Sequence, residues 1–373
     1  MARLEDVCSI NMGQSPESSS YNEAGEGIPF FQGNADFGKL HPTVRVWCDA
    51  PTKIAEQGDI LISVRAPIGA LNIANVQCCI GRGLAALTVN ERLCYQKYLW
   101  YALECKVDEL NSKGTGSTFK AINKKTLAET EIPLPSLDEQ RSIAALLDKV
   151  SDLIAKRRAQ LDKLDLLVKA RFVEMFEHVS DQVLLSDVAE VTGGLTKNSK
   201  RKDFPIKLPY LRVANVFFDT IDTDEILEIG LTEEEKRKTL LQNGDLLFVE
   251  GNGNPEQIGR VAVWQDEIVP CVHQNHLIKA RFNLAKMLPT YAMNYFMTQK
   301  GREQIREKAV STSGLYTLSV SKIESLHIPF APMDRQLQFT DFKEKVDKSK
   351  LTIRQSLNKL ETLKKALMQQ YFG

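Results

Sequence analysis

The residue types that most often carry catalysis are sparse in this sequence. Five histidines are present, and two of them, His273 and His276 in the stretch HQNH, have a spacing at which both could bind one metal ion. We favour a polar recognition or structural role for this pair over a metal site. The seven cysteines form no C-x-x-C motif. This pattern predicts buried, inert thiols and neither a disulfide framework nor a zinc site.

Motifs for nucleotide or methyl-group chemistry are also missing. No G-x-x-x-x-G-K-[ST] sequence occurs, which argues against nucleotide hydrolysis by this chain. The glycine-rich stretch GNGNPEQIG at 251–259 stands between two apolar runs, which favours a turn between strands over a phosphate-binding loop. There is no Asn-Pro-Pro-aromatic stretch of the kind that holds a flipped base, and no evident adenosylmethionine loop. We therefore expect no catalytic residue and no cofactor in this chain.

Polar and aromatic residues gather instead in loops flanked by glycine. In the first half of the chain these loops are FFQGNADFGK (30–39), SVRAPIG (63–69), CIGRGLAA (79–86) and GTGSTFKAINKKT (114–126). In the second half they are YLRVANVFFD (210–219), FVEGNGNPEQIGR (248–260), VHQNH (272–276) and STSGLYTLSVSK (311–322). Arg, Asn and Gln can distinguish base edges in the DNA major groove, and Lys, Ser and Thr serve phosphate oxygens. For any single residue, a plain surface or turn role is the alternative.

Composition sets limits on this hypothesis. The 373 residues include 48 Lys plus Arg and 48 Asp plus Glu, so the chain has no basic excess. This balance counts against DNA binding by the chain alone. The sequence has no run of 18 apolar residues and no basic-then-apolar start, so we expect a cytoplasmic protein that is neither secreted nor membrane-spanning.

The chain contains two copies of one plan. LEDVCSINMGQSP at 4–16 parallels LSDVAEVTGGLTK at 185–197, GDILISVRAPIGA at 58–70 parallels GDLLFVEGNGNPE at 244–256, and IPLPSLDEQRSI at 132–143 parallels IPFAPMDRQLQF at 328–339. The displacement grows only between these blocks, as expected if loops diverged on a retained scaffold.

Each copy has a globular part and a helical part. Short apolar runs bounded by Gly, Pro and Asn predict strands at 59–64, 84–89, 245–250 and 260–264, and shorter helices are expected at 95–110 and 289–309. The fold class is therefore α/β, with two similar mixed domains. The expected boundaries are 1–135 and 179–331 for these domains, and 136–178 and 332–373 for two helical spacers.

The helical parts have the apolar spacing of a coiled coil. The predicted seam consists of Leu147, Val150, Ile154, Leu161, Leu164, Val168, Val346, Ile353, Leu357, Leu360 and Leu367. Charged residues interrupt both stripes (Arg157, Arg171, Lys343, Lys350 and Lys364). We expect the two helices to pack against each other, with the long charged side chains at the edges of the seam. An antiparallel pair, each helix about 35 residues and roughly 50 Å long, would hold the globular domains at opposite ends, related by a pseudo-twofold axis.

These motifs resemble the specificity (S) subunit of type I restriction-modification systems. The resemblance rests on the repeated L-x-D-V opening, the G-D-[IL]-L strand, and the [IL]-P-[LF] exit followed by D-E-Q or D-R-Q and a long helix. It implies two target-recognition domains joined by an antiparallel coiled coil, with no active site. It also implies a bipartite, asymmetric double-stranded DNA target and docking of two adenine methyltransferase (M) subunits and restriction (R) subunits. S-adenosylmethionine would bind the M subunits, and ATP and Mg would bind an R subunit.

The DNA contacts are expected in the matching loops. In the first domain we expect base contacts from Gln32, Asn34 and Arg65, and base or phosphate contacts from Arg82, Thr118, Lys120 and Lys124. In the second domain the base candidates are Arg212, Asn215, Asn252, Asn254, His273 and Gln274, and the backbone candidates are Tyr316 and Lys322.

Three alternatives stay open at this point. A generic dimerisation coil would not explain why each helix follows its own sheet domain. A self-sufficient DNA methyltransferase or nuclease would transfer methyl groups or cut DNA without a partner. A scaffolding coiled-coil protein would show no sequence-selective DNA binding in any complex.

Overall fold

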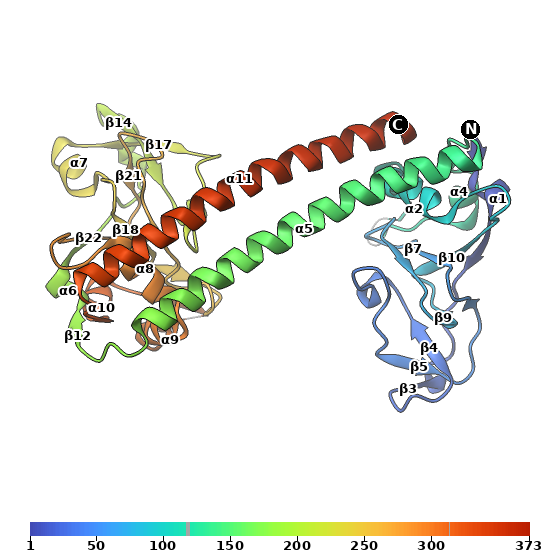
Figure 1. The fold of residues 1–373 in the computed structure, drawn as a ribbon, viewed down its shortest axis with the longest axis horizontal. Coiled ribbons are helices and arrows are strands. Elements are labelled where there is room, and N and C mark those ends of the chain that lie inside the picture. Colours follow the sequence, from blue (N-terminus) through green and yellow to red (C-terminus); the bar gives the residue numbers. More distant parts are fainter. Residues whose placement is uncertain (117–119, 313) are drawn as a thin grey trace. The chain divides into compact units, whose positions relative to one another are not determined.

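The computed structural model describes residues 1–116, 120–312 and 314–373. The chain divides into two compact units, which are described separately (Figure 1). The first unit contains residues 1–159 and 354–373, and the second contains residues 160–353. Both units mix helices and sheets, as the sequence predicts.

The central sheet of the first unit has four antiparallel strands. Their order is β2 (Cys8–Met12), β10 (Leu84–Val89), β7 (Ile60–Ser63) and β8 (Leu71–Ile73). Strand β7 is buried on both faces because helices cover one side and a second sheet the other. The predicted strands at 59–64 and 84–89 are thus confirmed.

The second unit repeats this sheet. Its order is β13 (Ala189–Gly193), β22 (Leu277–Phe282), β18 (Leu246–Val249) and β20 (Val261–Val263), again antiparallel. The strands predicted at 245–250 and 260–264 are confirmed, and 251–259 does connect them, although Gly251 and Asn252 also form a short strand, β19. The internal repeat is therefore a repeat of topology.

Each unit has a second sheet that contains one parallel pair. In the first unit the order is β3 (Tyr21–Asn22), β5 (Val46–Cys48), β4 (Ile28–Phe31), β9 (Cys78–Ile80) and β6 (Ile54–Ala55). In the second unit it is β17 (Leu227–Leu231), β14 (Ile206–Leu211) and β21 (Val272–His273). Strand β4 pairs in parallel with β9, and β14 with β21. The loops that follow β4, β9, β14 and β21 therefore meet at one sheet edge in their own unit.

Small elements complete each unit in the same order. The first unit has β1 (Ala2–Arg3), α1 (Leu4–Val7), α2 (Gln96–Cys105), α3 (Val107–Ser112), α4 (Lys124–Ala128) and β11 (Glu131–Ile132). The second has β12 (Gln182–Leu184), α6 (Leu185–Val188), β15 (Val216–Phe217), β16 (Thr220–Ile221), α7 (Glu233–Thr239), α8 (Pro289–Met297), α9 (Gln299–Lys308), β23 (Val310–Thr312), β24 (Leu315–Thr317), α10 (Val320–Glu324) and β25 (His327–Pro329).

Each shorter helix expected from the sequence is broken in two. The segment 289–309 divides at Thr298, whose side chain accepts a hydrogen bond from the main-chain nitrogen of Gly301 and so caps α9. A Cβ atom at Gly301 would lie 2.3 Å from the Tyr295 carbonyl oxygen, so the sharp break requires glycine there.

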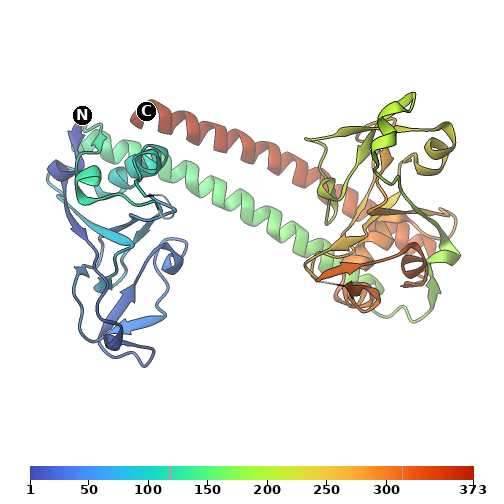
Figure 2. The same cartoon turned by 180° about the vertical axis from the view of Figure 1, so that it is seen from behind.

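Two long helices, α5 (Leu137–Phe176) and α11 (Met333–Phe372), have 40 residues each. At 1.5 Å per residue each is about 60 Å long, somewhat longer than expected. Within each unit the segments of the two helices lie side by side in both views (Figures 1 and 2). In the first unit, Leu147 near the start of α5 and Phe372 at the end of α11 share one core. In the second, Phe172 near the end of α5 packs on Phe339 near the start of α11, with ring centres 5.1 Å apart. The packing is antiparallel in both units, as predicted.

All eleven predicted seam residues are buried or half-buried. The expectation for the charged residues is confirmed for Lys364, whose ammonium lies 3.1 Å from Glu104 at the seam edge. It is wrong for Lys343 and Lys350, which are buried.

The two buried lysines are matched by carboxylates. Lys343 Nζ lies 3.0 Å from Asp219 and 2.7 Å from Asp347, and Lys350 pairs with Asp165 and Asp347. Burial alone would lower the pKa of Lys343, but the Asp219 and Asp347 carboxylates outweigh it and the pKa is raised. Burial also raises the pKa of Asp219 despite its partner. The two carboxylates thus favour the charged form of the Lys343 ammonium despite its burial.

The repeated Ile-Pro and Gln residues have one structural role in both copies. Gln140 is buried at the start of α5, where its amide oxygen accepts a 2.8 Å hydrogen bond from the Tyr95 nitrogen and its amide nitrogen donates to Pro135 and Leu93. Gln336 does the same at the start of α11, accepting from the Leu288 nitrogen at 2.8 Å and donating to the Ala331 and Lys286 carbonyls.

A tyrosine secures the same junction. The Tyr98 hydroxyl donates to the Pro133 carbonyl at 3.0 Å, and the Tyr291 hydroxyl donates to the Pro329 carbonyl at 2.9 Å. The junction sequence is repeated because it ties each long helix to the helix that precedes it.

The seven cysteines are all free, and six are buried while Cys105 is half-buried. Burial raises the pKa of Cys8, Cys78, Cys94 and Cys271 to about 12. A raised pKa keeps these thiols protonated at neutral pH, and the thiolate is the reactive form. The prediction of inert thiols is consistent with these raised pKa values. Among the described residues, no helix has the length and apolar character needed to cross a bilayer.

The glutamine junction gives a stability prediction. We expect Gln336→Leu to lower the free energy of unfolding by about 2–4 kcal/mol, because it strands a buried N–H and two carbonyl groups. Gln338→Leu, the same change at an exposed position of the same helix, should alter it by less than about 0.5 kcal/mol. Urea unfolding measures both, and equal effects would show that the junction hydrogen bonds are not what stabilises the helix start.

Candidate nucleic-acid interface

Four of the residues predicted to contact DNA line one cavity of the first unit. Gln32, Asn34, Arg65 and Arg82 surround an open cavity of about 330 Å³ together with Asp36, Arg45 and Ser63. The four residues come from the loops after β4 and β9, which are parallel neighbours in one sheet, and from the loop after β7, which belongs to the central sheet. The cavity therefore collects three guanidinium groups and two carboxamides in one place.

The backbone geometry of this site depends on glycine. A Cβ atom at Gly83 would lie 2.5 Å from the Gln32 carbonyl oxygen, and one at Gly13 would lie 2.2 Å from the Gly81 carbonyl oxygen. The glycines around Arg82 therefore permit a close approach of three loops that larger residues would block. Gly194 has the same role in the second unit, where a Cβ atom would lie 2.3 Å from the His273 carbonyl oxygen.

Sequence reasoning missed Arg45, which lies just before β5. Its guanidinium forms an ion pair with Asp36 and donates to the Ala35 carbonyl at 2.7 Å. Asp36 in turn accepts a 2.8 Å hydrogen bond from the Gln32 nitrogen. These contacts fix the loop that carries Gln32 and Asn34, while Arg65 and Arg82 are exposed. Arg45 lies outside the glycine-flanked loops, so the criterion used on the sequence could not have found it.

The remaining candidates of the first unit lie beside Arg65. The Lys120 carbonyl accepts a 3.0 Å hydrogen bond from the Ala66 nitrogen, and Lys124 opens α4; both lysines are exposed. Thr118 lies outside the described residues.

One predicted base contact of the second unit, Asn215, is structural in this fold. Asn215 is buried; its oxygen accepts from the Arg212 nitrogen at 2.9 Å, and its nitrogen donates to the Asp222 and Glu225 carbonyls. It shapes the loop and presents no free group to a base, so the prediction for Asn215 is wrong. Arg212 is half-buried; its guanidinium donates to the Glu225 carbonyl at 3.0 Å and lies 3.5 Å from the Glu225 carboxylate, and 22% of its side chain is exposed.

The prediction for His273 is also wrong in this structure, because its imidazole is fully buried. Nδ1 lies 3.0 Å from the Thr239 carbonyl. Burial, followed by the nearby Lys279 ammonium, lowers the pKa of His273 to about 4. Gln274 is half-buried and His276 is exposed, with Nδ1 2.8 Å from Glu250. His273 ends β21 and is buried, whereas Gln274 follows the strand and is half-buried, a difference that the dense polar run HQNH concealed.

Asn252 and Tyr316 are brought together as cross-strand partners of β19 and β24. The Asn252 oxygen accepts a 2.9 Å hydrogen bond from the nitrogen of Asn254, which is exposed. Lys322 lies on α10 and is half-buried. The second unit thus offers Arg212, Gln274 and the Asn252–Tyr316 pair on its loops.

An aromatic hairpin of the second unit was also missed. Phe217 and Phe218 connect β15 to β16 and are partly exposed. The Arg260 guanidinium lies 5.2 Å from the Phe217 ring, and the Arg302 guanidinium lies 5.0 Å from the Phe218 ring. These cation–π contacts hold two aromatic faces beside the loop of Arg212.

Both candidate sites present hydrogen-bonding side chains and positive charge. In the described part of the chain, no three His, Cys, Asp or Glu side chains are grouped so that they could hold a metal ion. Guanidinium and carboxamide groups at a loop-lined edge suit paired hydrogen bonds to base edges and ionic contacts to phosphates.

Comparison with known families agrees with the duplicated plan. The model of the type I restriction modification DNA specificity domain matches residues 1–164 and again residues 180–362. The chain therefore belongs to this family, and the resemblance seen in the sequence motifs is confirmed.

Individual relatives are specificity subunits. The chain is 44% identical over 161 residues to the MjaX type I restriction enzyme specificity subunit of Methanocaldococcus jannaschii, covering 43% of this chain and 38% of the relative's length. It is 25% identical over 331 residues to the MjaIX specificity subunit of the same organism, covering 83% of this chain and 67% of the relative. The solved type I restriction-modification S subunit of M. genitalium matches 100% of this chain and 95% of its own with a TM-score of 0.58. At 14% identity, that likeness shows the shared fold.

The buried imidazole predicts acid sensitivity. A His pKa lowered on folding gives stability that is present above the unfolded pKa and lost as pH falls toward the folded value. Between pH 7.5 and 5 we expect the free energy of unfolding to fall by about 2 kcal/mol through His273, using 6.5 for the unfolded pKa. In urea unfolding at both pH values, His273→Gln should remove this component, whereas exposed His276→Gln should retain it. An unchanged pH dependence in His273→Gln would contradict the assignment.

Proposed function

We propose that this chain is the non-catalytic specificity subunit of a type I restriction-modification complex. Each globular domain reads one half of a bipartite, asymmetric DNA site. The observation that carries the proposal is the same sheet topology used twice, with different polar side chains at the equivalent edges. Because the first unit offers Gln32, Arg65 and Arg82 where the second offers Arg212 and Gln274, the two half-sites should differ in sequence.

The two long helices would set the separation of the half-sites. Each helix is continuous over 40 residues and belongs to the core of both units in turn. A rigid element of this kind fixes a spacing better than a flexible linker does, and dimeric DNA readers need a fixed spacing between half-sites.

The outer faces of the helices are the proposed docking surface for the methyltransferase subunits. Several large apolar side chains on these helices are exposed: Leu146, Leu153, Leu166, Leu167, Val173, Leu337, Leu351 and Leu363. Leu146 and Leu153 are one heptad apart, and Leu167 is two heptads further along, so these three share a face of α5. Apolar side chains repeated along one exposed face are typical of a surface that a partner covers.

The proposed roles of the subunits determine where the cofactors would bind. S-adenosylmethionine would bind the methyltransferase subunits, ATP and Mg would bind a restriction subunit, and this chain would need neither. Partner subunits would also supply positive charge, which a chain with equal numbers of acidic and basic residues requires to hold DNA tightly. The complex would act in the cytoplasm, where its DNA substrate lies.

The direct test is methylation mapping. We expect DNA modified by the full chain together with its methyltransferase subunits to carry methyladenine at a two-part asymmetric sequence with a fixed gap. Methylation by the chain alone, or methylation without sequence preference, would overturn the proposal.

Arg65 tests whether the cavity reads bases. We expect Arg65→Ala to relax the base preference at one or more positions of one half-site, because loss of a bidentate contact removes about 1–3 kcal/mol of discrimination. The other half-site should be unchanged. Arg92→Ala, an exposed arginine of the first unit outside the cavity, is the matched control. Methylation mapping of both variants gives the answer, and an unaltered motif in Arg65→Ala would refute the contact.

The docking surface has its own test. We expect the double variant Leu153→Glu and Leu167→Glu to bind the methyltransferase subunit at least tenfold more weakly, a loss of about 1.4 kcal/mol or more. Exposed positions should leave the fold intact, which circular dichroism checks. Lys156→Glu with Lys163→Glu, also exposed on α5, is the control for added negative charge. Equal binding by the wild-type chain and the leucine variant would place the docking surface elsewhere.

A further inference from the structure

A basic arm, residues 197–202, lies between β13 and β14 in the second unit. Its 3-10 helix covers Ser199–Asp203, and Lys197, Lys200 and Lys202 are exposed along it. Among the described residues, the structure shows no hydrogen bond or ion pair for these three ammonium groups. The arm therefore carries three solvent-facing positive charges within six residues.

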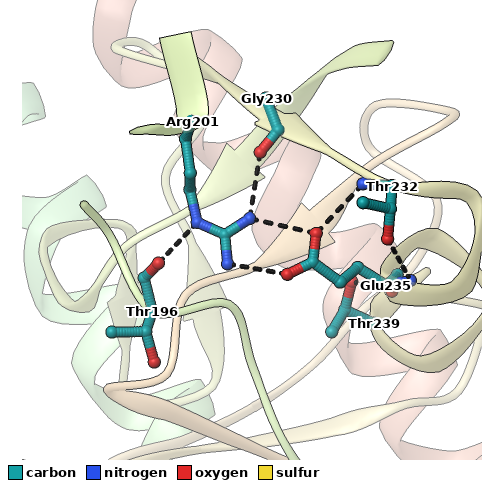
Figure 3. Close-up of polar contacts among 6 residues, drawn as sticks. All are labelled: Thr196, Arg201, Gly230, Thr232, Glu235 and Thr239. Atoms are coloured by element: carbon teal, nitrogen blue, oxygen red, sulfur yellow. Dashed lines mark hydrogen bonds and ion pairs between the residues drawn. The ribbon is translucent and has the colours of Figure 1, made fainter. Parts of the chain in front are cut away.

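The fourth basic residue of the arm, Arg201, is buried and turned inward (Figure 3). Its guanidinium makes a two-pronged ion pair with Glu235, at 2.9 Å and 3.2 Å, and donates to the Gly230 carbonyl at 3.0 Å and to the Thr196 carbonyl. The hydrogen bonds from Arg201 lower the pKa of Glu235, so the carboxylate stays ionised at neutral pH. One arginine thus clips the whole arm to the body of the unit.

The receiving surface is itself rigid. Thr232 and Glu235 form a reciprocal cap at the start of α7, with hydrogen bonds of 3.0 Å and 3.2 Å between side chains and main chain. A Cβ atom at Gly230 would lie 1.9 Å from the Arg201 carbonyl oxygen, so the arm lies against the backbone of β17. This close fit holds the arm in one place before any ligand binds.

The arm begins beside a proposed base contact. The Leu195 nitrogen donates to the His273 carbonyl at 2.9 Å, and the Asn275 nitrogen donates to the Leu195 carbonyl at 3.0 Å. Lys197 is therefore two residues along the chain from a segment hydrogen-bonded on both sides of Gln274.

The first unit has no basic counterpart. Its equivalent 3-10 helix, Ser18–Ser20, follows Pro16 and Glu17 and contains no lysine or arginine. Positive charge lies instead in the cavity, on Arg45, Arg65 and Arg82. Arg82 follows β9 in the first unit. In the second unit the residues that follow the corresponding strand, β21, are the neutral Gln274 and Asn275.

We propose that residues 197–202 are a phosphate-binding arm, clipped by the Arg201–Glu235 ion pair, through which the second domain holds the backbone of the DNA next to its half-site. The inference rests on the proposed DNA-reading function. It adds that the two domains hold the backbone differently, one through a cavity and the other through a preformed arm. Phosphate contacts of this kind set register and affinity and carry no base preference.

The test uses the full chain with its methyltransferase subunits and a duplex that contains the site found by methylation mapping. We expect the triple variant Lys197→Ala, Lys200→Ala and Lys202→Ala to keep the same motif but to bind with a smaller salt dependence. Removing three phosphate contacts lowers the slope of log K against log salt by roughly 2–3. Ethylation of phosphates should interfere with wild-type binding beside the second half-site, and this interference should vanish in the variant.

The matched control removes the same charge from a neighbouring surface. Lys236, Arg237 and Lys238 lie on α7, where Lys236 and Lys238 already pair with Glu233 and Glu234. Changing these three residues to alanine should leave the slope of log K against log salt unchanged. An equal fall of this slope in both triple variants would show a general effect of charge and would overturn the proposal that residues 197–202 bind phosphate. Glu235→Gln keeps the three lysines but weakens the clip, so it should lower affinity with little change of slope.

Two failures can be told apart. If the wild-type complex selects no DNA site, the proposed function fails. If the wild-type complex selects its site and the triple variant has the same salt slope and the same phosphate interference, the arm proposal alone fails.

Discussion

An aromatic contact at the end of each long helix is the constraint on which the rest of the fold depends. Phe372, at the end of α11, packs on Tyr98 with ring centres 5.0 Å apart, and Phe176, at the end of α5, packs on Tyr291 at 4.7 Å. Each tyrosine also holds the proline junction from which the other long helix starts. The core of each unit thus includes the end of a long helix that begins in the other copy of the repeat.

Around this frame, the residues with structural roles recur while the exposed ones differ. Gln140 and Gln336 make the same hydrogen bonds, and Gly13 and Gly194 permit the same close approach. The exposed side chains of the sheet-edge loops differ between the units, and so do the segments that follow β2 and β13. A duplicated scaffold with divergent edges can present two unlike surfaces to one ligand, and a DNA site with two unlike halves is a ligand of that kind.

Periodicity and the internal repeat predicted the architecture well, because helix seams and buried strands follow from the spacing of apolar residues alone. The cavity residues Gln32, Asn34, Arg65 and Arg82 were selected because they are polar residues in loops flanked by glycine, and the fold brings these loops together. Burial of Lys343, Lys350 and His273 was not predicted, since Asp219, Asp165 and the Thr239 carbonyl, which compensate these groups, come from distant parts of the chain. The inward turn of Arg201 depends on Glu235 in the same way. Asn215 is compensated by neighbouring residues, and its burial was also not predicted.

The most direct measurement of the central claim is the gap of the methylated site after one heptad is inserted into both long helices, after residue 159 in α5 and after residue 355 in α11. Seven residues keep the seam in register and add about 10 Å to each helix. If the helix pair fixes the separation of the two half-sites, the gap should lengthen by about three base pairs at roughly 3.4 Å per pair, with both half-sites unchanged. An unchanged gap in a folded, active complex would contradict the account.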